Sequence, residues 1–183
     1  AAWMLRERFT GSRHRTEPQP AENARPYDLV KRAQEDLRYF GRRGNVDRAI
    51  DRLKRAVQQD ANYAPAWAAL AEAHWLKFRE SPDPVLLNAA GDHAQKAVSL
   101  NPDLAVGRIW LGAFLLDSGR RDAALKEFQR AIDLDPRSAD AHRLLGIGLA
   151  SLKRDGEAEQ SLRKAVSMAG DDWRTHNSLA VFL

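Results

Sequence analysis

A fixed spacing of small residues constrains this chain more than any other feature. One set of alanines recurs at intervals of 41, 34 and 34 residues: Ala49, Ala90, Ala124 and Ala158. A second set keeps the same intervals: Ala56, Ala97, Ala131 and Ala165. Large-small pairs follow them, offset by half a period: Leu70-Ala71, Leu111-Gly112, Leu145-Gly146 and Leu179-Ala180. Three marker sets with one period indicate that a single supersecondary unit is repeated along the chain.

The clearest copy of the unit is residues 105–138. Its first half is apolar through most of its length, the Asp117-Ser-Gly119 tripeptide interrupts it, and residues 122–134 carry apolar side chains at helical spacing before Asp135-Pro136. Small residues at Gly112, Ala124 and Ala131 allow two helix backbones to approach closely, with Phe128 filling the space around them. Each unit is therefore predicted to be a helical hairpin.

The order of these markers resembles the tetratricopeptide repeat (TPR) family, whose 34-residue unit carries a large-small pair, a lone Ala, an aromatic residue or Leu, another Ala and a Pro. The resemblance covers residues 27–183 and implies an all-α fold, a right-handed solenoid of antiparallel helix pairs. We expect repeats at residues 30–63, 64–104, 105–138 and 139–172, with a partial or truncated repeat at residues 173–183. Residues 1–26 are interpreted as a basic segment followed by a Pro-rich linker.

Two departures from the pattern stand out. In the second repeat, 20 residues rather than 13 separate Leu70 from Ala90, and we expect the seven extra residues to lie between its two helices. Residues 78–84 are the predicted place, because Pro82 and Pro84 cannot occupy a helix interior. In the first repeat, Asp36 stands where Leu is usual, as expected of an atypical terminal unit.

The basic start of the chain allows several interpretations. Trp3, Met4, Leu5 and Phe9 fit the end of an upstream helix or membrane span, a segment that folds back onto the repeats, or a remnant without structure of its own. Residues 1–55 carry 14 Lys and Arg against 8 Asp and Glu, a balance of +6 in a chain whose net charge is +4. Nucleic acid is a disfavoured partner, because most of these cations alternate with acids on predicted helices, as on a solvated face.

No catalytic or ligand-binding motif is present in the sequence. The chain has no Cys, its histidines at 74, 93, 142 and 176 are far apart, and no Gly-rich phosphate loop occurs. We therefore expect no enzyme activity, no metal and no cofactor in this segment. His142 and His176, which occupy the repeat position of Trp67, are interpreted as packing or groove-edge residues.

The resemblance to the TPR family implies a ligand groove on the concave face, lined by the first helix of each repeat. The family's contact positions in this chain predict a groove that is basic at one end and apolar in the middle: Arg38, Arg42, Ala68, Glu72, Trp75, Ile109, Trp110, Ala113, Leu116, Arg143, Leu144 and Ile147. The set that clamps a chaperone's C-terminal carboxylate in some members is absent. Two Trp residues favour a hydrophobic or amphipathic helical segment as ligand, unless neighbouring repeats or a further domain cover them.

The predicted function is a protein-interaction scaffold, with an unidentified protein or peptide as partner. The alternative is a regulatory TPR domain of a larger membrane-anchored signalling or transcription-regulating protein, because residues 26–33 and 63–71 also resemble repeat modules of bacterial multidomain regulators. Membrane contact is expected only through an upstream segment, and oligomers are possible through the C-terminal face. We expect a cytoplasmic location, or the cytoplasmic side of a membrane if an upstream span exists.

Overall fold

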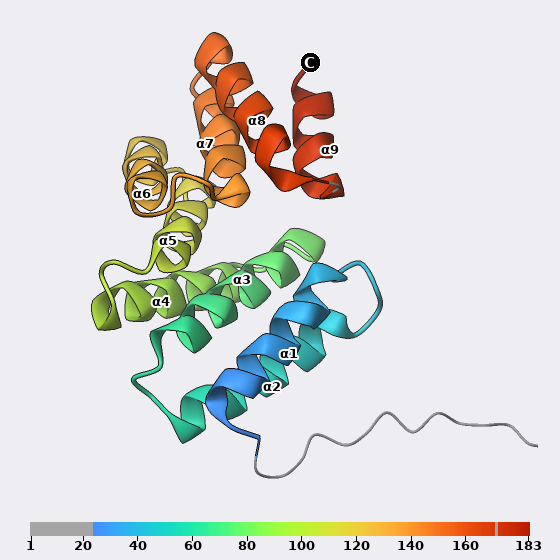
Figure 1. Ribbon diagram of the computed structural model, residues 1–183, viewed down its shortest axis with the longest axis vertical. Helices are drawn as coiled ribbons and strands as arrows, with labels where there is room; N and C mark the ends of the chain where they lie inside the picture. Colours follow the sequence, from blue (N-terminus) through green and yellow to red (C-terminus); the bar gives the residue numbers. More distant parts are fainter. Residues whose placement is uncertain (1–23, 171) are drawn as a thin grey trace, which may run out of the picture.

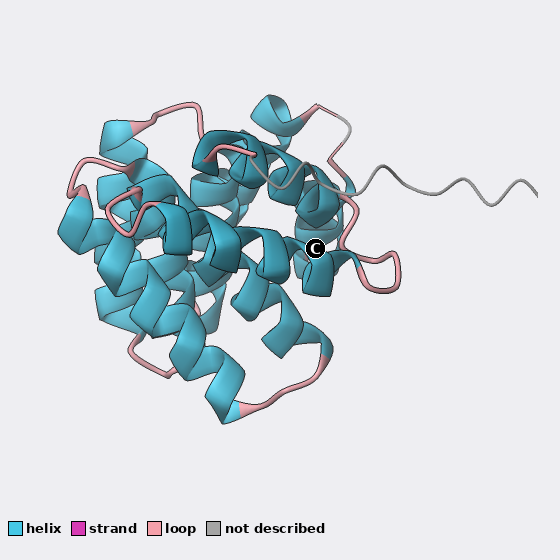
Figure 2. Cartoon of the chain, turned by 90° about the horizontal axis from the view of Figure 1, so that it is seen from below, coloured by secondary structure: helices cyan, strands magenta, loops and turns pink. Residues whose placement is uncertain are grey.

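The fold is made of helices alone in the residues that the structure, a computed structural model, describes: 24–170 and 172–183 (Figures 1 and 2). In chain order they are α1 (Pro26–Arg38), α2 (Asn45–Gln59), α3 (Ala64–Glu80), α4 (Pro84–Leu100), α5 (Ala105–Asp117), α6 (Arg121–Leu134), α7 (Ala139–Ser151), α8 (Asp155–Ala169) and α9 (Trp173–Phe182). This confirms the predicted all-α solenoid. The interpretations of residues 1–23, including those of Trp3, Met4, Leu5 and Phe9, concern positions outside the described residues.

Consecutive helices pair into four antiparallel hairpins, and α9 packs against α8 and α7. The first helices of successive hairpins also contact one another, α1 with α3, α3 with α5 and α5 with α7. Each repeat thus buries its apolar face against the next repeat, as in other helical repeat proteins. None of the helices in the described residues is both long and apolar enough to cross a membrane.

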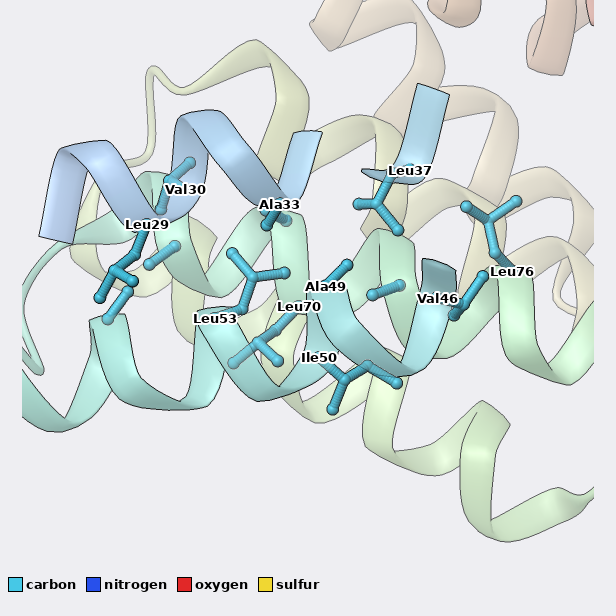
Figure 3. Close-up of a cluster of buried hydrophobic side chains, with 14 of the residues drawn as sticks. Leu29, Val30, Ala33, Leu37, Val46, Ala49, Ile50, Leu53, Leu70 and Leu76 are labelled. Carbon is cyan, nitrogen blue, oxygen red and sulfur yellow. The ribbon is translucent and has the colours of Figure 1, made fainter. Parts of the chain in front are cut away.

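The core consists of alternating large and small side chains. Around the first repeat, Leu29, Leu37, Leu53 and Leu70 are at most 2% exposed and point toward one another from three helices (Figure 3). In the middle of the array the ring of Phe128 is fully buried, and a Cβ atom added at Gly112 would lie 2.5 Å from it. The repeating large-small pair therefore marks the point where the two helices of a hairpin approach most closely.

The extra residues of the second repeat form helix, which differs from the expected loop. Helices α3 and α4 contain 17 residues each, and only residues 81–83 connect them. Pro82 lies in this connection and Pro84 occupies the first turn of α4, where a proline costs no hydrogen bond. The Asp83 side chain accepts a hydrogen bond from the Val85 amide at 2.8 Å and caps the helix. The two prolines therefore mark a helix start rather than an extended loop.

Asp36, which replaces the usual Leu, is held by cations from α2. Its carboxylate pairs with Arg52 and lies 3.7 Å from Arg48, and its side chain is 13% exposed. An ion pair therefore joins α1 to α2 at a position that other repeats fill with an apolar side chain.

Candidate functional site

The structure places most of the predicted groove residues inside the array. Ala68, Ile109, Trp110, Ala113, Arg143 and Leu144 are buried, Glu72, Trp75, Leu116 and Ile147 are half-buried, and Arg38 and Arg42 are exposed. All of them lie on the first helices of their repeats except Arg42, which lies in the turn after α1. Neighbouring repeats, however, cover the middle of the predicted apolar floor.

The two tryptophans that were expected to anchor a ligand pack against each other. Their ring centroids are 5.5 Å apart, and the Trp75 indole N–H donates to the Asp117 carboxylate at 2.6 Å. Trp110 is 2% exposed, and its N–H has no hydrogen-bond partner among the described residues. This pair therefore joins α3 to α5, which agrees with the interpretation that neighbouring repeats cover these side chains.

Beside this apolar contact lies a cluster of charged side chains from α3, α7 and the start of α9. Arg174 lies 3.3 Å from the Asp172 carboxylate and 3.9 Å from that of Glu72, and Arg143 pairs with Asp140 at 2.7 Å. Thr175 is fully buried and donates to Asp172 at 2.8 Å. These contacts link α9 to the second repeat through the interior of the array.

The carboxyl group of Glu72 is the most perturbed acid of this cluster. Burial raises its pKa to about 7, with a further contribution from the negative charge of Asp140, while Arg174 and Arg143 oppose the rise. Glu72 therefore changes charge close to neutral pH, within a cluster that holds two repeats and α9 together.

Two histidines that are distant in sequence also meet. The ring centroids of His74 and His93 are 5.0 Å apart, and Trp67 lies 5.4 Å from His93. Burial, followed by the neighbouring His74, lowers the pKa of His93 to about 4. Within residues 24–170 and 172–183, no group of three or more His, Asp and Glu side chains is placed to hold a metal ion. Both rings pack between α3 and α4.

The exposed residues of the predicted site, Arg38 and Arg42, lie at the end of α1 and in the turn that follows it. In Figure 1 this turn lies below the start of α9. A cleft of about 800 Å³ separates the turn after α1 from the connection between α8 and α9, and we call it the end cleft. Its lining residues are Arg38, Tyr39, Phe40, Gly41, Arg42, Ala169, Asp172, Trp173 and Arg174. The cleft thus brings Arg38 and Arg42 together with aromatic side chains from both ends of the chain.

Aromatic stacking and cation–π contacts organise the end cleft. The rings of Phe40 and Trp173 stack with centroids 5.8 Å apart, although 133 positions separate them in the sequence. The Arg42 guanidinium lies 4.9 Å from the Tyr39 ring centroid, and that of Arg174 lies 5.9 Å from the Phe40 centroid. Trp173 is 59% exposed and Tyr39 is 54% exposed, so both rings remain accessible to a ligand although Phe40 and Arg42 pack against them.

Local hydrogen bonds hold the turn that carries Tyr39 to Arg42. Gly44 adopts a left-handed conformation with φ of 81°, which a residue with a side chain would adopt less readily. The Asn45 side chain then donates to the backbone carbonyl oxygens of Tyr39 at 2.9 Å and Asp36 at 3.3 Å. These contacts therefore fix the conformation of the turn, which presents its side chains toward α9.

A second hollow, of about 690 Å³, lies between the α7–α8 turn and α9. Its lining includes Ile147, Leu162 and Phe182, and Val181 is 79% exposed. This is the C-terminal face on which oligomer formation was considered.

Of the nine residues that line the end cleft, only Arg38 and Arg42 were predicted from the sequence; the seven that were missed include Tyr39, Phe40, Trp173 and Arg174. Trp173 was assigned to the first helix of the last repeat, but the repeat period gives no information on contacts between the first unit and the fifth. An exposed aromatic at a turn and another at a helix start were the only available signals.

Comparisons with known proteins agree with this architecture. Residues 115–172 match the family model of the tetratricopeptide repeat, whereas a comparison with curated protein sequences finds no match. A thermophilic TPR protein of Thermus thermophilus is 24% identical in sequence, with a TM-score of 0.70 over 86% of this chain and 80% of that one. PilF of Pseudomonas aeruginosa is 22% identical, with a TM-score of 0.61 over 86% of this chain and 69% of that one.

An O-GlcNAc transferase of Thermobaculum terrenum is 21% identical, with a TM-score of 0.59 over 77% of this chain and 27% of the transferase. At such identities these likenesses concern the fold. Together with the family match over residues 115–172 and the observed helical hairpins, they show that the chain has the fold of tetratricopeptide repeat proteins. This fold is typical of protein-interaction scaffolds, which vary their surface residues on a common framework.

Proposed function

We propose that the protein is a scaffold that binds a polypeptide segment of a partner protein in the end cleft. The observation that carries the proposal is the exposure of Trp173 and Tyr39 on opposite walls of one cleft, with Arg38 and Arg42 beside them. Aromatic side chains in a concave site provide large contact areas at a small entropic cost, and they are frequent energetic anchors of protein recognition.

In this proposal the buried residues of the predicted groove stabilise the array and do not contact the ligand. Trp75, Trp110 and Ile109 hold adjacent repeats together and thereby fix the curvature that brings Phe40 to Trp173. Direct peptide binding by these residues stays a prediction, and it requires an opening between repeats because Trp110 is 2% exposed.

A peptide selection tests the proposal. Peptides are selected from a random displayed library against the full chain, and the affinity of the best binder is measured by isothermal titration calorimetry. Trp173→Ala should weaken this affinity by roughly 2 kcal/mol, about 30-fold, because the variant removes the largest exposed ring of the cleft.

Two tyrosines on the first repeat provide the matched control. Tyr39 lines the end cleft, whereas Tyr27 is 62% exposed at the start of α1 and does not line it. Tyr39→Ala should weaken binding, and Tyr27→Ala should leave the affinity unchanged. Equal affinity for the wild type and the Trp173 and Tyr39 variants, with helical content preserved, would place the ligand elsewhere and end this proposal.

One observation favours a second candidate, a regulatory module within a larger protein. The aligned region spans only 27% of the Thermobaculum terrenum transferase, so an arrangement of this shape also occurs inside a much longer enzyme. Binding of a neighbouring domain of the same polypeptide in the end cleft would combine both functions.

A further inference from the structure

The charges of the end cleft carry information about the ligand. Arg38 and Arg42 are exposed in its lining, and Arg43 lies in an adjoining hollow that shares Phe40, Gly41 and Arg42 with it. None of these three arginines makes an ion pair with a carboxylate of the residues that the structure describes. Their guanidinium groups therefore keep their hydrogen-bond donors available for a ligand.

The acidic side chain described in the cleft lining is already engaged. Asp172 accepts from Thr175 at 2.8 Å and lies 3.3 Å from Arg174. These contacts hold the pKa of Asp172 below its usual value even though burial acts in the opposite direction. Asp172 is therefore an ionised internal partner of Arg174, and it does not neutralise Arg38 or Arg42.

The same cleft also has an apolar part. The stacked rings of Phe40 and Trp173 form a platform, and the cation–π contact of Arg42 with Tyr39 forms one edge of it. A flat apolar side chain can stack on the exposed Trp173 face, while carboxylates on either side of that residue reach the arginines.

We propose that the ligand of the end cleft is an acidic polypeptide segment in which an aromatic residue is flanked by Asp and Glu. This inference rests on the proposed function and names its partner class. The aromatic residue of the segment stacks on Trp173, and its carboxylates pair with Arg38, Arg42 and Arg43.

Two other occupants fit these charges less well. Residues 1–23 of the chain contain four Arg and three Glu, so the chain's own N-terminal segment does not provide a strongly acidic ligand. Nucleic acid requires a continuous basic path along its backbone, but Asp47 and Glu80 line the adjoining hollow together with Arg43. Asp47 is 62% exposed and pairs with Lys77, so it interrupts such a path.

Peptides that differ only in charge test the inference on the full chain. The probe is a short fluorescein-labelled peptide with a central Phe flanked on both sides by Asp and Glu, and the comparison peptide replaces these acids by Asn and Gln. Fluorescence anisotropy at low salt should give an affinity at least about tenfold higher for the acidic probe, and this advantage should shrink as salt is added.

Charge reversal localises the effect. Arg42→Glu should lower the affinity for the acidic probe by about tenfold or more and affect the amide peptide much less, whereas Arg42→Lys should retain most of the binding. The matched control is Arg121→Glu on α6, because Arg121 is also exposed but lies outside the lining of the end cleft. Circular dichroism of each variant verifies that the helices are retained.

The possible results separate the two proposals. Equal affinities for the acidic and amide probes, both reduced by Trp173→Ala, would overturn the acidic ligand and leave the scaffold function intact. If neither Trp173→Ala nor Arg42→Glu changes the affinity for either probe, the probes bind outside the end cleft. Unlabelled acidic peptide should displace the acidic probe. If instead a synthetic peptide of residues 1–23 or a single-stranded oligonucleotide displaces the probe and unlabelled acidic peptide does not, the cleft has a different occupant and the inference is wrong.

Discussion

At the scale of single residues, glycine and alanine determine how closely the helices of a hairpin approach. A Cβ atom at Gly112 would lie 2.5 Å from the Phe128 ring, and one at Gly146 would lie 2.7 Å from the Leu162 side chain. Phe128 is fully buried and Leu162 is 1% exposed, so neither side chain can move away without displacing others. The small member of each large-small pair is thus required by the packing.

Gly112→Ala tests this requirement. The added methyl group would collide with Phe128, and we expect the free energy of unfolding to fall by about 1 to 3 kcal/mol although Ala favours helix over Gly. The matched control is Gly156→Ala, because nothing lies within 4 Å of a Cβ atom at that helical position. Urea denaturation of both variants gives the comparison, and equal stabilities would contradict the close approach seen at Phe128.

At the scale of elements, a charged cluster rather than apolar packing alone holds α9 against the rest of the array. Glu72 from α3, Asp140 and Arg143 from α7, and Asp172 and Arg174 at the start of α9 form this cluster. Buried ion pairs of this kind stabilise the folded protein less than their number suggests, because each charged group loses its hydration. The raised pKa of Glu72 reflects this loss.

Glu72→Gln should therefore change how stability depends on pH. With a folded-state pKa of about 7 against an ordinary value of 4.5, the wild type binds an extra proton on folding, so its stability falls as the pH rises through this interval. The variant has no carboxyl group at this position and does not lose stability in this way. As the pH rises from about 4.5 to above 7, its free energy of unfolding relative to wild type should therefore increase by an amount on the order of 3 kcal/mol.

Urea denaturation of the two proteins over this pH range measures the difference, with the exposed Glu80→Gln at the end of α3 as control. A difference between Glu72→Gln and wild type that stays constant with pH would mean that folding does not raise the pKa of Glu72.

At the scale of the whole molecule, the sequence predicted the helical hairpins more completely than the candidate site. The 34-residue period identifies each pair of helices because every unit packs with the same small and large residues, such as Gly112 and Phe128. The period also assigns Trp110 to the predicted groove on the first helix of its repeat. It contains no information on how tightly the array curves, and this curvature decides that Trp110 is buried while Arg42 remains accessible.

The contact between the two ends follows from the sum of several repeat interfaces, so no local pattern marks Phe40 and Trp173 as neighbours. The same limit applies to the second repeat, where the seven extra residues were assigned to a loop. Pro82 and Pro84 cannot lie in a helix interior, but a proline is compatible with both a loop and the first turn of a helix. The sequence therefore did not show that Pro82 lies in a short connection and Pro84 in the first turn of α4.

The contact between the ends also predicts an energetic coupling that a simple repeat array lacks. In such an array each unit interacts only with its neighbours, so substitutions in the first and last units should have additive effects on stability. Here the Phe40 and Trp173 rings stack at 5.8 Å. A double-mutant cycle with Phe40→Ala and Trp173→Ala should therefore give a coupling free energy of about 0.5 to 1.5 kcal/mol. The control cycle pairs Trp173→Ala with Tyr27→Ala, whose side chain is exposed away from the cleft, and should be additive. Additive effects in both cycles would mean that the ends do not touch in solution and that the end cleft is not a stable feature of the protein.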